Sequence, residues 1–171
     1  MTERKGVITF KGGPLTLVGN EVKMGDAAPD AALLANDLSP VQLSSYRGKV
    51  VILSVVPSLD TSVCDLQTRK FNERGAALSK DVEILTISMD LPFAQKRWCG
   101  AAGVERVRTL SDHRDAAFGT AYGLLIKELR LLARAVLVVD KAGKVQYAQL
   151  VKEVTTEPDY DAALAATQKL I

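Results

Sequence analysis

Residues 49–64 read KVVILSVVPSLDTSVC. The first eight residues are mostly apolar and rich in β-branched side chains, which predicts a buried strand over 49–56. A segment of helical composition follows, from Ser62 to about Lys80. Cys64 therefore lies where a strand passes to a helix, close to the helix N-terminus. The free backbone N–H groups and the positive end of the helix dipole there favour the thiolate, which is the reactive form of cysteine.

The rest of the chain continues this alternation of strands and helices. We expect strands at 82–89, 107–110, 135–140 and 144–150, helices at 92–102, 115–122 and 157–170, a Gly-Gly hairpin within 7–18, and a short strand near 41–43. Strand–helix–strand order predicts parallel strands with helices on both faces, and the late hairpin adds antiparallel strands. The order predicts an α/β, thioredoxin-like fold: a central mixed β-sheet flanked by helices, with an N-terminal β-hairpin, in a single domain over 1–171.

Composition argues against several classes of function. The chain has 171 residues, of which 47% are hydrophobic and 25% charged, with a net charge of +2. No run of lysine or arginine indicates nucleic-acid binding, and no apolar segment approaches the roughly 20 residues of a membrane span. The first six residues are charged and lack the apolar stretch of a secretory signal. We expect a cytoplasmic protein that binds neither nucleic acid nor membrane.

The two cysteines, Cys64 and Cys99, are too few for a disulfide scaffold. Such a pair is structural and reduced, metal-binding or redox-active, and each cysteine alone is compatible with an inert, buried thiol. A zinc site formed with His113 lacks the usual ligand spacing, and His113 is expected in a solvated loop.

Pro57, Thr61 and Cys64 have the Pro-x-x-x-Thr-x-x-Cys spacing of the peroxiredoxins. The whole loop resembles that of the bacterial thiol peroxidases, the atypical two-cysteine branch of that family. Three further stretches resemble the same branch: 90–100, 133–136 and 155–160. The resemblance runs from the N-terminal hairpin to the last helix.

The resemblance implies a role for each of these residues. Cys64 would be the peroxidatic cysteine that becomes a sulfenic acid, and Cys99 the resolving cysteine that closes an intramolecular disulfide. Thr61 and Arg134 would complete the site, and Pro57 would fix the chain's exit from the strand. It also implies hydrogen peroxide and organic hydroperoxides as substrates, thioredoxin as reductant, a homodimer, and no metal, haem or flavin cofactor.

Physical arguments from the residues are consistent with two of these roles. Arg134 offers rigid N–H donors and a permanent charge, although Arg69 and Arg130 offer the same and a solvated arginine is the alternative. The Thr61 hydroxyl, three positions before Cys64, is placed to cap the helix or to reach the sulfur.

Cys64 and Cys99 are 35 positions apart on different elements. A disulfide needs Cα atoms about 4.4–6.8 Å apart, so we expect the helix ends around both cysteines to unwind during the reaction. The only tryptophan, Trp98, is next to Cys99 and would report such a movement, whether or not it is simply a packing residue.

Two other functions remain open. A thioredoxin-type dithiol oxidoreductase normally has Cys-x-x-Cys, where this chain has Thr61, and a redox sensor would use the same oxidation without turnover. The apolar residues in 122–132 are compatible with a substrate mouth favouring lipid-like hydroperoxides, with a dimer face, or with buried core.

Overall fold

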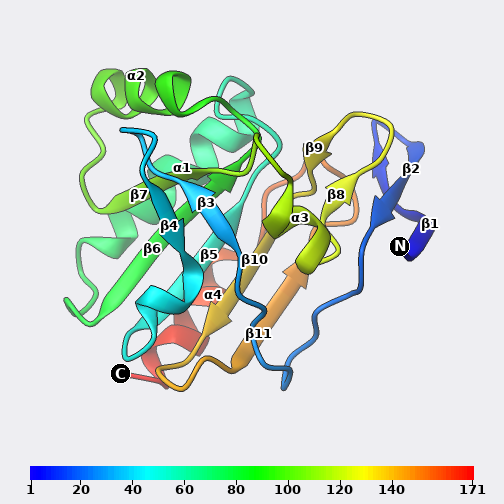
Figure 1. Ribbon diagram of the computed structural model, residues 1–171. Helices are drawn as coiled ribbons and strands as arrows, with labels where there is room; N and C mark the ends of the chain where they lie inside the picture. Colours follow the sequence, from blue (N-terminus) through cyan, green and yellow to red (C-terminus); the bar gives the residue numbers. More distant parts are fainter.

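The computed structural model describes all residues from 1 to 171 (Figure 1). Its strands are β1 (Glu3–Phe10), β2 (Gly13–Val18), β3 (Ala32–Leu34), β4 (Pro40–Gln42), β5 (Val50–Val55), β6 (Val82–Ser88), β7 (Val107–Ser111), β8 (Leu125–Ile126), β9 (Leu131–Leu132), β10 (Ala135–Val139) and β11 (Val145–Leu150). Its helices are α1 (Ser62–Gly75), α2 (Pro92–Ala102), α3 (Ala117–Ala121) and α4 (Tyr160–Gln168), with a 3-10 turn at Leu43–Tyr46. No helix has the length and apolar character needed to cross a bilayer.

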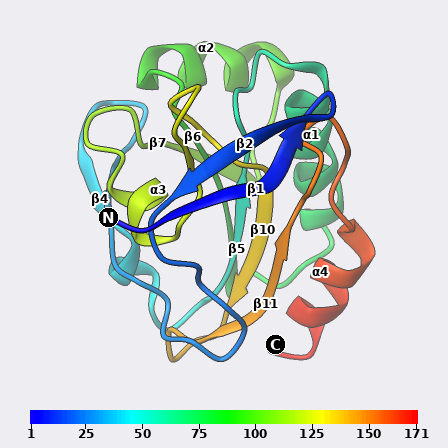
Figure 2. The ribbon, with the colours of Figure 1, turned by 90° about the vertical axis from the view of Figure 1, so that its right-hand side faces the viewer.

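The main sheet has seven strands in the order β11-β10-β5-β6-β7-β3-β4. β5, β6 and β7 are parallel, whereas β10, β11, β3 and β4 join antiparallel. This is the predicted mixed sheet, flanked by helices. The N-terminal hairpin forms a second sheet, in the order β1-β2-β8-β9, which lies beside β10 and β11 (Figure 2).

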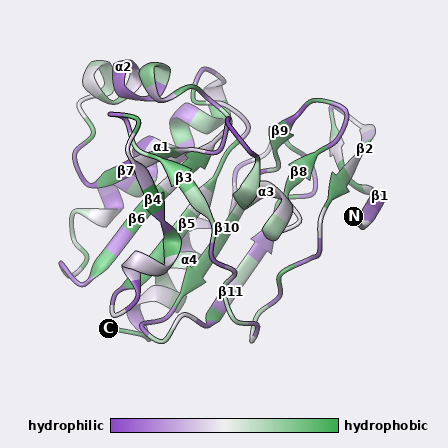
Figure 3. Ribbon diagram, viewed as in Figure 1, coloured by the Kyte–Doolittle hydropathy of each residue, from purple (hydrophilic) through white to green (hydrophobic).

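The two faces of the main sheet bury different clusters. Odd-numbered residues 51–55 of β5 belong to a cluster with Phe118 of α3, whereas Val50 and Ile52 belong to a cluster with Phe71 of α1. This alternation is what a strand buried on both faces requires. The central strands are accordingly apolar along most of their length (Figure 3). Figure 2 shows α1 and α4 on one side of the sheet and α3 on the other.

Helix α2 lies across the end of the sheet at which the parallel strands finish (Figure 1). The connections from β5 to α1 and from β6 to α2 both start at this end. The segments that carry the two cysteines therefore leave the same edge of the sheet, where functional groups of open α/β sheets gather.

Two helix boundaries differ from the prediction. α1 ends at Gly75 rather than near Lys80, because the Arg106 side chain binds the Gly75 carbonyl (Nε–O 3.1 Å) and Gly75 packs closely on Ile84. α4 begins at Tyr160 rather than at residue 157, because the Asp159 carboxylate accepts a hydrogen bond from the Ala162 N–H and caps the helix there.

The N-terminal hairpin forms as predicted, but its turn residues are Lys11 and Gly12, not Gly12 and Gly13. Both turn residues have positive φ, 49° and 82°, as a tight hairpin turn requires, and Gly13 is already in β2.

The apolar run after α3 is mainly core. Residues 122–126 and Leu132 are buried. The sequence did not predict β8 and β9, of which β8 pairs with β2 of the hairpin and β9 pairs with β8. Only Leu129, 45% exposed, keeps a large apolar surface in this segment. Burial supports the interpretation of most of this run as core, and the lipid-like preference loses its basis in the buried residues.

Candidate active site around Cys64

Cys64 is the third residue of α1, and its side chain is fully buried. It packs in a small apolar cluster with Val56 and Leu59 from the loop that precedes the helix, and Trp98 of α2 packs against this cluster. The sulfur therefore lies between the two helices, at the edge of the sheet where β5 ends. It is not an isolated core thiol, because a charged side chain reaches it.

That charged side chain belongs to Arg134, which directly precedes β10 and is only 2% exposed. Its Nη2 donates to the Cys64 sulfur at 3.2 Å. Its Nε donates to the Val154 carbonyl at 2.8 Å, and its Nη1 to the Gln67 Oε1 at 3.0 Å. Three different partners thus fix the guanidinium plane, with one N–H donor and a positive charge beside the sulfur.

The other arginines considered from the sequence do not reach Cys64. Arg69 pairs with Asp65 on the outside of α1, and Arg130 is exposed in the turn between β8 and β9. The structure therefore distinguishes Arg134 from both.

Gln67 is a site residue that sequence reasoning missed. It is fully buried. Its Oε1 accepts a hydrogen bond from the Arg134 Nη1, and its Nε2 donates one to the Ser54 hydroxyl at 2.8 Å. It stands three residues after Cys64, and residues at that spacing share one face of a helix. That spacing, together with a polar side chain on the buried face of α1, is the signal that could have found it.

Thr61 occupies the N-cap position of α1 in extended backbone, but its hydroxyl caps no N–H of the helix. The hydroxyl donates instead to the Ser58 carbonyl at 3.0 Å, and it makes no hydrogen bond to the sulfur. The predicted side-chain cap and sulfur contact are therefore absent. Because its proton is used by Ser58, the exposed hydroxyl offers its lone pairs as acceptors beside the start of α1. Pro57 is buried two residues after β5, near the start of this loop.

Asp90, two residues after β6, holds the Cys64 loop to the loop that leads into α2. Its carboxylate accepts hydrogen bonds from the Ser58 hydroxyl (2.7 Å), the Leu59 N–H (2.8 Å) and the Ser88 hydroxyl (2.7 Å). No separate feature of the sequence selects this residue. Its effect is to fix the two cysteine-bearing segments at their common base.

Cys99 is half-buried in α2, and its sulfur contacts the Thr109 hydroxyl of β7 at 3.5 Å. Burial raises the pKa of the Cys99 thiol, and the hydrogen bond to Thr109 offsets part of that shift. Both cysteines are free thiols. Cys99 thus packs toward β7 whereas Cys64 packs toward Arg134, so the two sulfurs belong to different environments.

No group of His, Cys, Asp and Glu side chains is arranged to hold a metal ion. His113, considered with the cysteines as a zinc ligand, is partly buried after β7, where its backbone N–H donates to the Ser111 hydroxyl.

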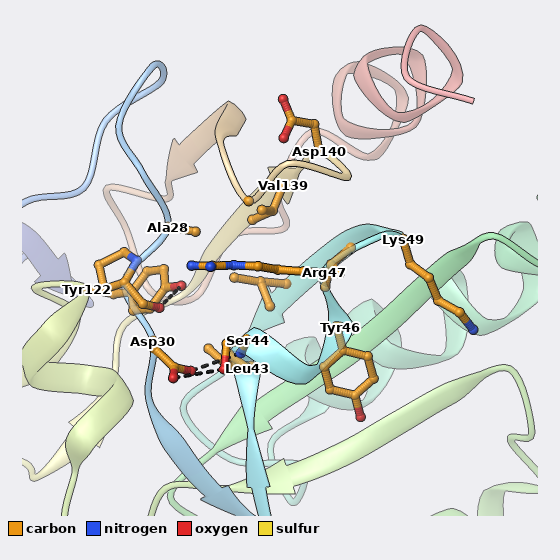
Figure 4. A pocket seen from close by; sticks show the side chains of 14 residues that line it. Ala28, Asp30, Leu43, Ser44, Tyr46, Arg47, Lys49, Tyr122, Val139 and Asp140 are labelled. Atoms are coloured by element: carbon orange, nitrogen blue, oxygen red, sulfur yellow. Dashed lines mark hydrogen bonds between the residues drawn. The ribbon is translucent and has the colours of Figure 1, made fainter.

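A separate pocket lies at the other end of β5, remote from Cys64 (Figure 4). The Arg47 side chain extends across it, Asp30 accepts hydrogen bonds from Ser44, and the Tyr122 hydroxyl donates to the Pro29 carbonyl. The cavity volume is only about 30 Å³, which suits a water molecule or two. This pocket contains neither cysteine.

Comparisons with known proteins agree with this geometry. Residues 23–164 match the Redoxin family. Thiol peroxidases from Halalkalibacterium halodurans and Bacillus subtilis are 62% and 59% identical, over 94% and 96% of this chain and 96% and 98% of theirs. A crystal structure of a peroxiredoxin-like protein from Aquifex aeolicus superposes with a TM-score of 0.91 at 44% identity, covering 97% of this chain and 98% of that one.

The fold and the buried cysteine–arginine pair define a thiol-based redox enzyme of thioredoxin-like architecture. The chain belongs to the redoxin family, and within it to the thiol peroxidases. The family resemblance inferred from the active-site loop is confirmed.

Proposed function

We propose that the protein reduces hydrogen peroxide and organic hydroperoxides at Cys64, using electrons from a thiol reductant. The observation that carries this proposal is the hydrogen bond from the Arg134 Nη2 to the Cys64 sulfur, made between two side chains that are almost fully buried. A structural thiol has no need of a buried guanidinium, whereas a nucleophilic thiolate is stabilised by one.

In the proposed first step the Cys64 thiolate attacks one peroxide oxygen and the O–O bond breaks. The sulfur becomes a sulfenic acid, and the second oxygen leaves, with one proton, as water or an alcohol. Negative charge develops on the departing oxygen as the bond breaks. The Arg134 N–H groups, held by Gln67 and Val154, lie beside the reacting sulfur and stabilise that charge. The exposed Thr61 hydroxyl is proposed to accept a hydrogen bond from the O–H group of the bound peroxide.

In the proposed second step the Cys99 thiol attacks the sulfenic acid of Cys64. The S–S bond forms, the S–O bond breaks, and the thiol proton leaves with the hydroxyl as water. We expect α2 to unwind before this attack. The contact of the Cys99 sulfur with the Thr109 hydroxyl supports that expectation, because it holds the sulfur against β7. A thioredoxin-type protein then reduces the disulfide by thiol exchange. Position 61 is Thr, so the chain has no Cys-x-x-Cys pair for dithiol chemistry of its own.

We further propose one catalytic domain over 1–171 that acts in the cytoplasm as a homodimer, without metal, haem or flavin. Three large apolar side chains on and beside the two cysteine-bearing helices support an interface there: Leu66, Leu91 and Phe93 are 39%, 53% and 65% exposed.

The test is NADPH-coupled peroxide turnover with thioredoxin and its reductase. Cys64→Ser is expected to abolish turnover, whereas Cys99→Ser is expected to complete one oxidation and then stall without another thiol. Turnover by Cys64→Ser at the wild-type rate would overturn the proposal, and peroxide oxidation of wild type without turnover would indicate a sensor instead.

A further inference from the structure

A single side-chain hydrogen bond joins α1 to α2. The Trp98 Nε1 donates to the Asp65 Oδ1 at 2.8 Å, and the Asp65 Oδ2 accepts from the Arg69 Nε at 2.9 Å. The Arg69 guanidinium lies over the Trp98 ring, 5.5 Å from its centroid. Three side chains thus close on one another, and we call this set the Asp65–Trp98–Arg69 tie.

The position of the tie relates it directly to the two cysteines. Asp65 follows Cys64 in α1, and Trp98 precedes Cys99 in α2. Trp98 also packs against the apolar cluster that contains Cys64. Any movement of Cys99 toward Cys64 that unwinds α2 must displace Trp98, and displacing Trp98 breaks its hydrogen bond to Asp65.

The remaining attachments of α2 lie mainly at its start. Gln95 donates to the Ser88 hydroxyl at 3.1 Å and to the Leu110 carbonyl at 2.9 Å, which fixes the first turn. The second half of the helix has only two side-chain hydrogen bonds, that of Trp98 and the 3.5 Å contact of Cys99 with Thr109. The tie is therefore the main polar restraint on the part of α2 that carries Cys99.

We propose that Asp65 is a positioning residue that holds the Cys99 segment in its helix through Trp98 and so limits the rate of disulfide closure. This inference rests on the proposed function, in which Cys99 resolves the Cys64 sulfenic acid. A slower closure prolongs the life of the sulfenic acid. A second hydroperoxide then has time to oxidise it to the sulfinic acid, transferring one oxygen to sulfur and leaving as water or an alcohol. The tie thus sets how readily the enzyme is inactivated by excess peroxide.

The test compares variants that remove the tie from either side. Asp65→Ala removes the acceptor and keeps Trp98 as a fluorophore, whereas Trp98→Phe removes the donor and keeps Asp65 paired with Arg69. Asp65→Asn retains an oxygen that accepts the indole N–H. Glu73→Ala is the matched control, because Glu73 is an exposed carboxylate on the same helix without a side-chain hydrogen bond.

Each protein is mixed with peroxide, quenched at intervals with acid and a thiol-blocking reagent, and its species are separated by intact mass. Sulfenic acid, disulfide and sulfinic acid have different masses, so Cys64 oxidation and disulfide closure are timed separately. We expect closure about fivefold faster in Asp65→Ala and Trp98→Phe, as for loss of a partly exposed hydrogen bond to a carboxylate. The sulfinic fraction per cycle should fall by the same factor, Asp65→Asn should be intermediate, and Glu73→Ala should match wild type.

The readout also separates the inference from the proposed function. Trp98 packs against the cluster around Cys64, so any effect of Trp98→Phe on the oxidation of Cys64 is timed separately and does not enter the comparison of closure rates. Closure in Asp65→Ala and Trp98→Phe at or below the wild-type rate, in proteins that do form the disulfide, would overturn the role of Asp65. Failure of wild type to form a sulfenic acid or disulfide would overturn the proposed function itself.

Discussion

Arg134 and Cys64 are 70 positions apart in the chain, yet the guanidinium of one donates to the sulfur of the other at 3.2 Å. The arginine directly precedes β10, and the cysteine lies in the first turn of α1. β10 pairs with β5, the strand that leads to the Cys64 loop. The antiparallel register of β5 and β10 therefore brings the start of one strand beside the end of the other, and the site follows from that pairing.

Replacement of Arg134 tests the site most directly. Arg134→Met should slow peroxide oxidation of Cys64 by about 100-fold, because it removes both the charge and the donor beside the reacting sulfur. Stopped-flow mixing with peroxide measures the rate. Arg114→Met, at an exposed arginine without side-chain hydrogen bonds, should react like wild type. An unchanged rate in a folded Arg134→Met protein would show that the contact has no part in the chemistry.

Gln67 should act on the rate through Arg134. Gln67→Leu leaves the Arg134 Nη1 and the Ser54 hydroxyl without their partner, so we expect oxidation of Cys64 to slow by about tenfold and unfolding to require about 1–3 kcal/mol less free energy. Gln67→Glu restores an acceptor for the guanidinium and should recover most of the rate. A loss of stability in Gln67→Leu with no change in rate would limit this residue to a structural role.

Asp90 should contribute to stability rather than to the chemistry. Asp90→Ala removes the acceptor of three hydrogen bonds and should lower the free energy of unfolding by about 2–3 kcal/mol in urea titrations. Asp60→Ala, in the Cys64 loop that Asp90 binds, removes an exposed carboxylate without a hydrogen-bonded partner and serves as control. Equal midpoints for the two variants would contradict the role given to Asp90.

Acid stability should depend on Glu153. Hydrogen bonds from the Thr155 and Gly12 N–H groups and from the Thr155 and Thr9 hydroxyls lower the pKa of this carboxyl from 4.5 to about 2. The folded pKa is below the unfolded one, so this stabilisation is complete above about pH 4.5 and is lost as the pH falls toward 2. The melting temperature of Glu153→Gln should fall less between pH 5 and pH 3 than that of wild type. Parallel pH profiles for the two proteins would exclude this linkage.

The central part of the fold was predictable because its signals are local. The bounds of α2 follow from Pro92 at its start and Gly103, in left-handed conformation, after its end. β5 and β6 follow from their apolar, β-branched composition. β8 and β9, with two residues each, have no local signal, because β8 forms only against the hairpin strand β2 and β9 only against β8.

Among the site residues, Pro57, Thr61 and Cys64 carry a recognisable spacing, and Arg134 and Cys99 were assigned through the same resemblance. The geometry supports the assignment of Arg134 and leaves the roles of Cys99 and Thr61 as proposals. Gln67 and Asp90 were not predicted, because a buried polar side chain is informative only when its partners are known. The same reason explains the early end of α1, which depends on Arg106 from 31 positions further along the chain.

The N-terminal hairpin lies outside residues 23–164, the part that matches the family as a whole. In the hairpin turn, the Gly12 N–H nevertheless donates a hydrogen bond to the Glu153 carboxylate. The Thr9 carbonyl accepts a hydrogen bond from the Val154 N–H, and the Val154 carbonyl accepts one from the Arg134 Nε. A series of hydrogen bonds and chain neighbours therefore connects an exposed surface turn with the reactive sulfur. Proteolytic cleavage or a bulky tag at Lys11 would weaken the support of Val154 and Arg134 from a site on the surface. Recombinant versions of the enzyme should therefore keep the N-terminal hairpin intact.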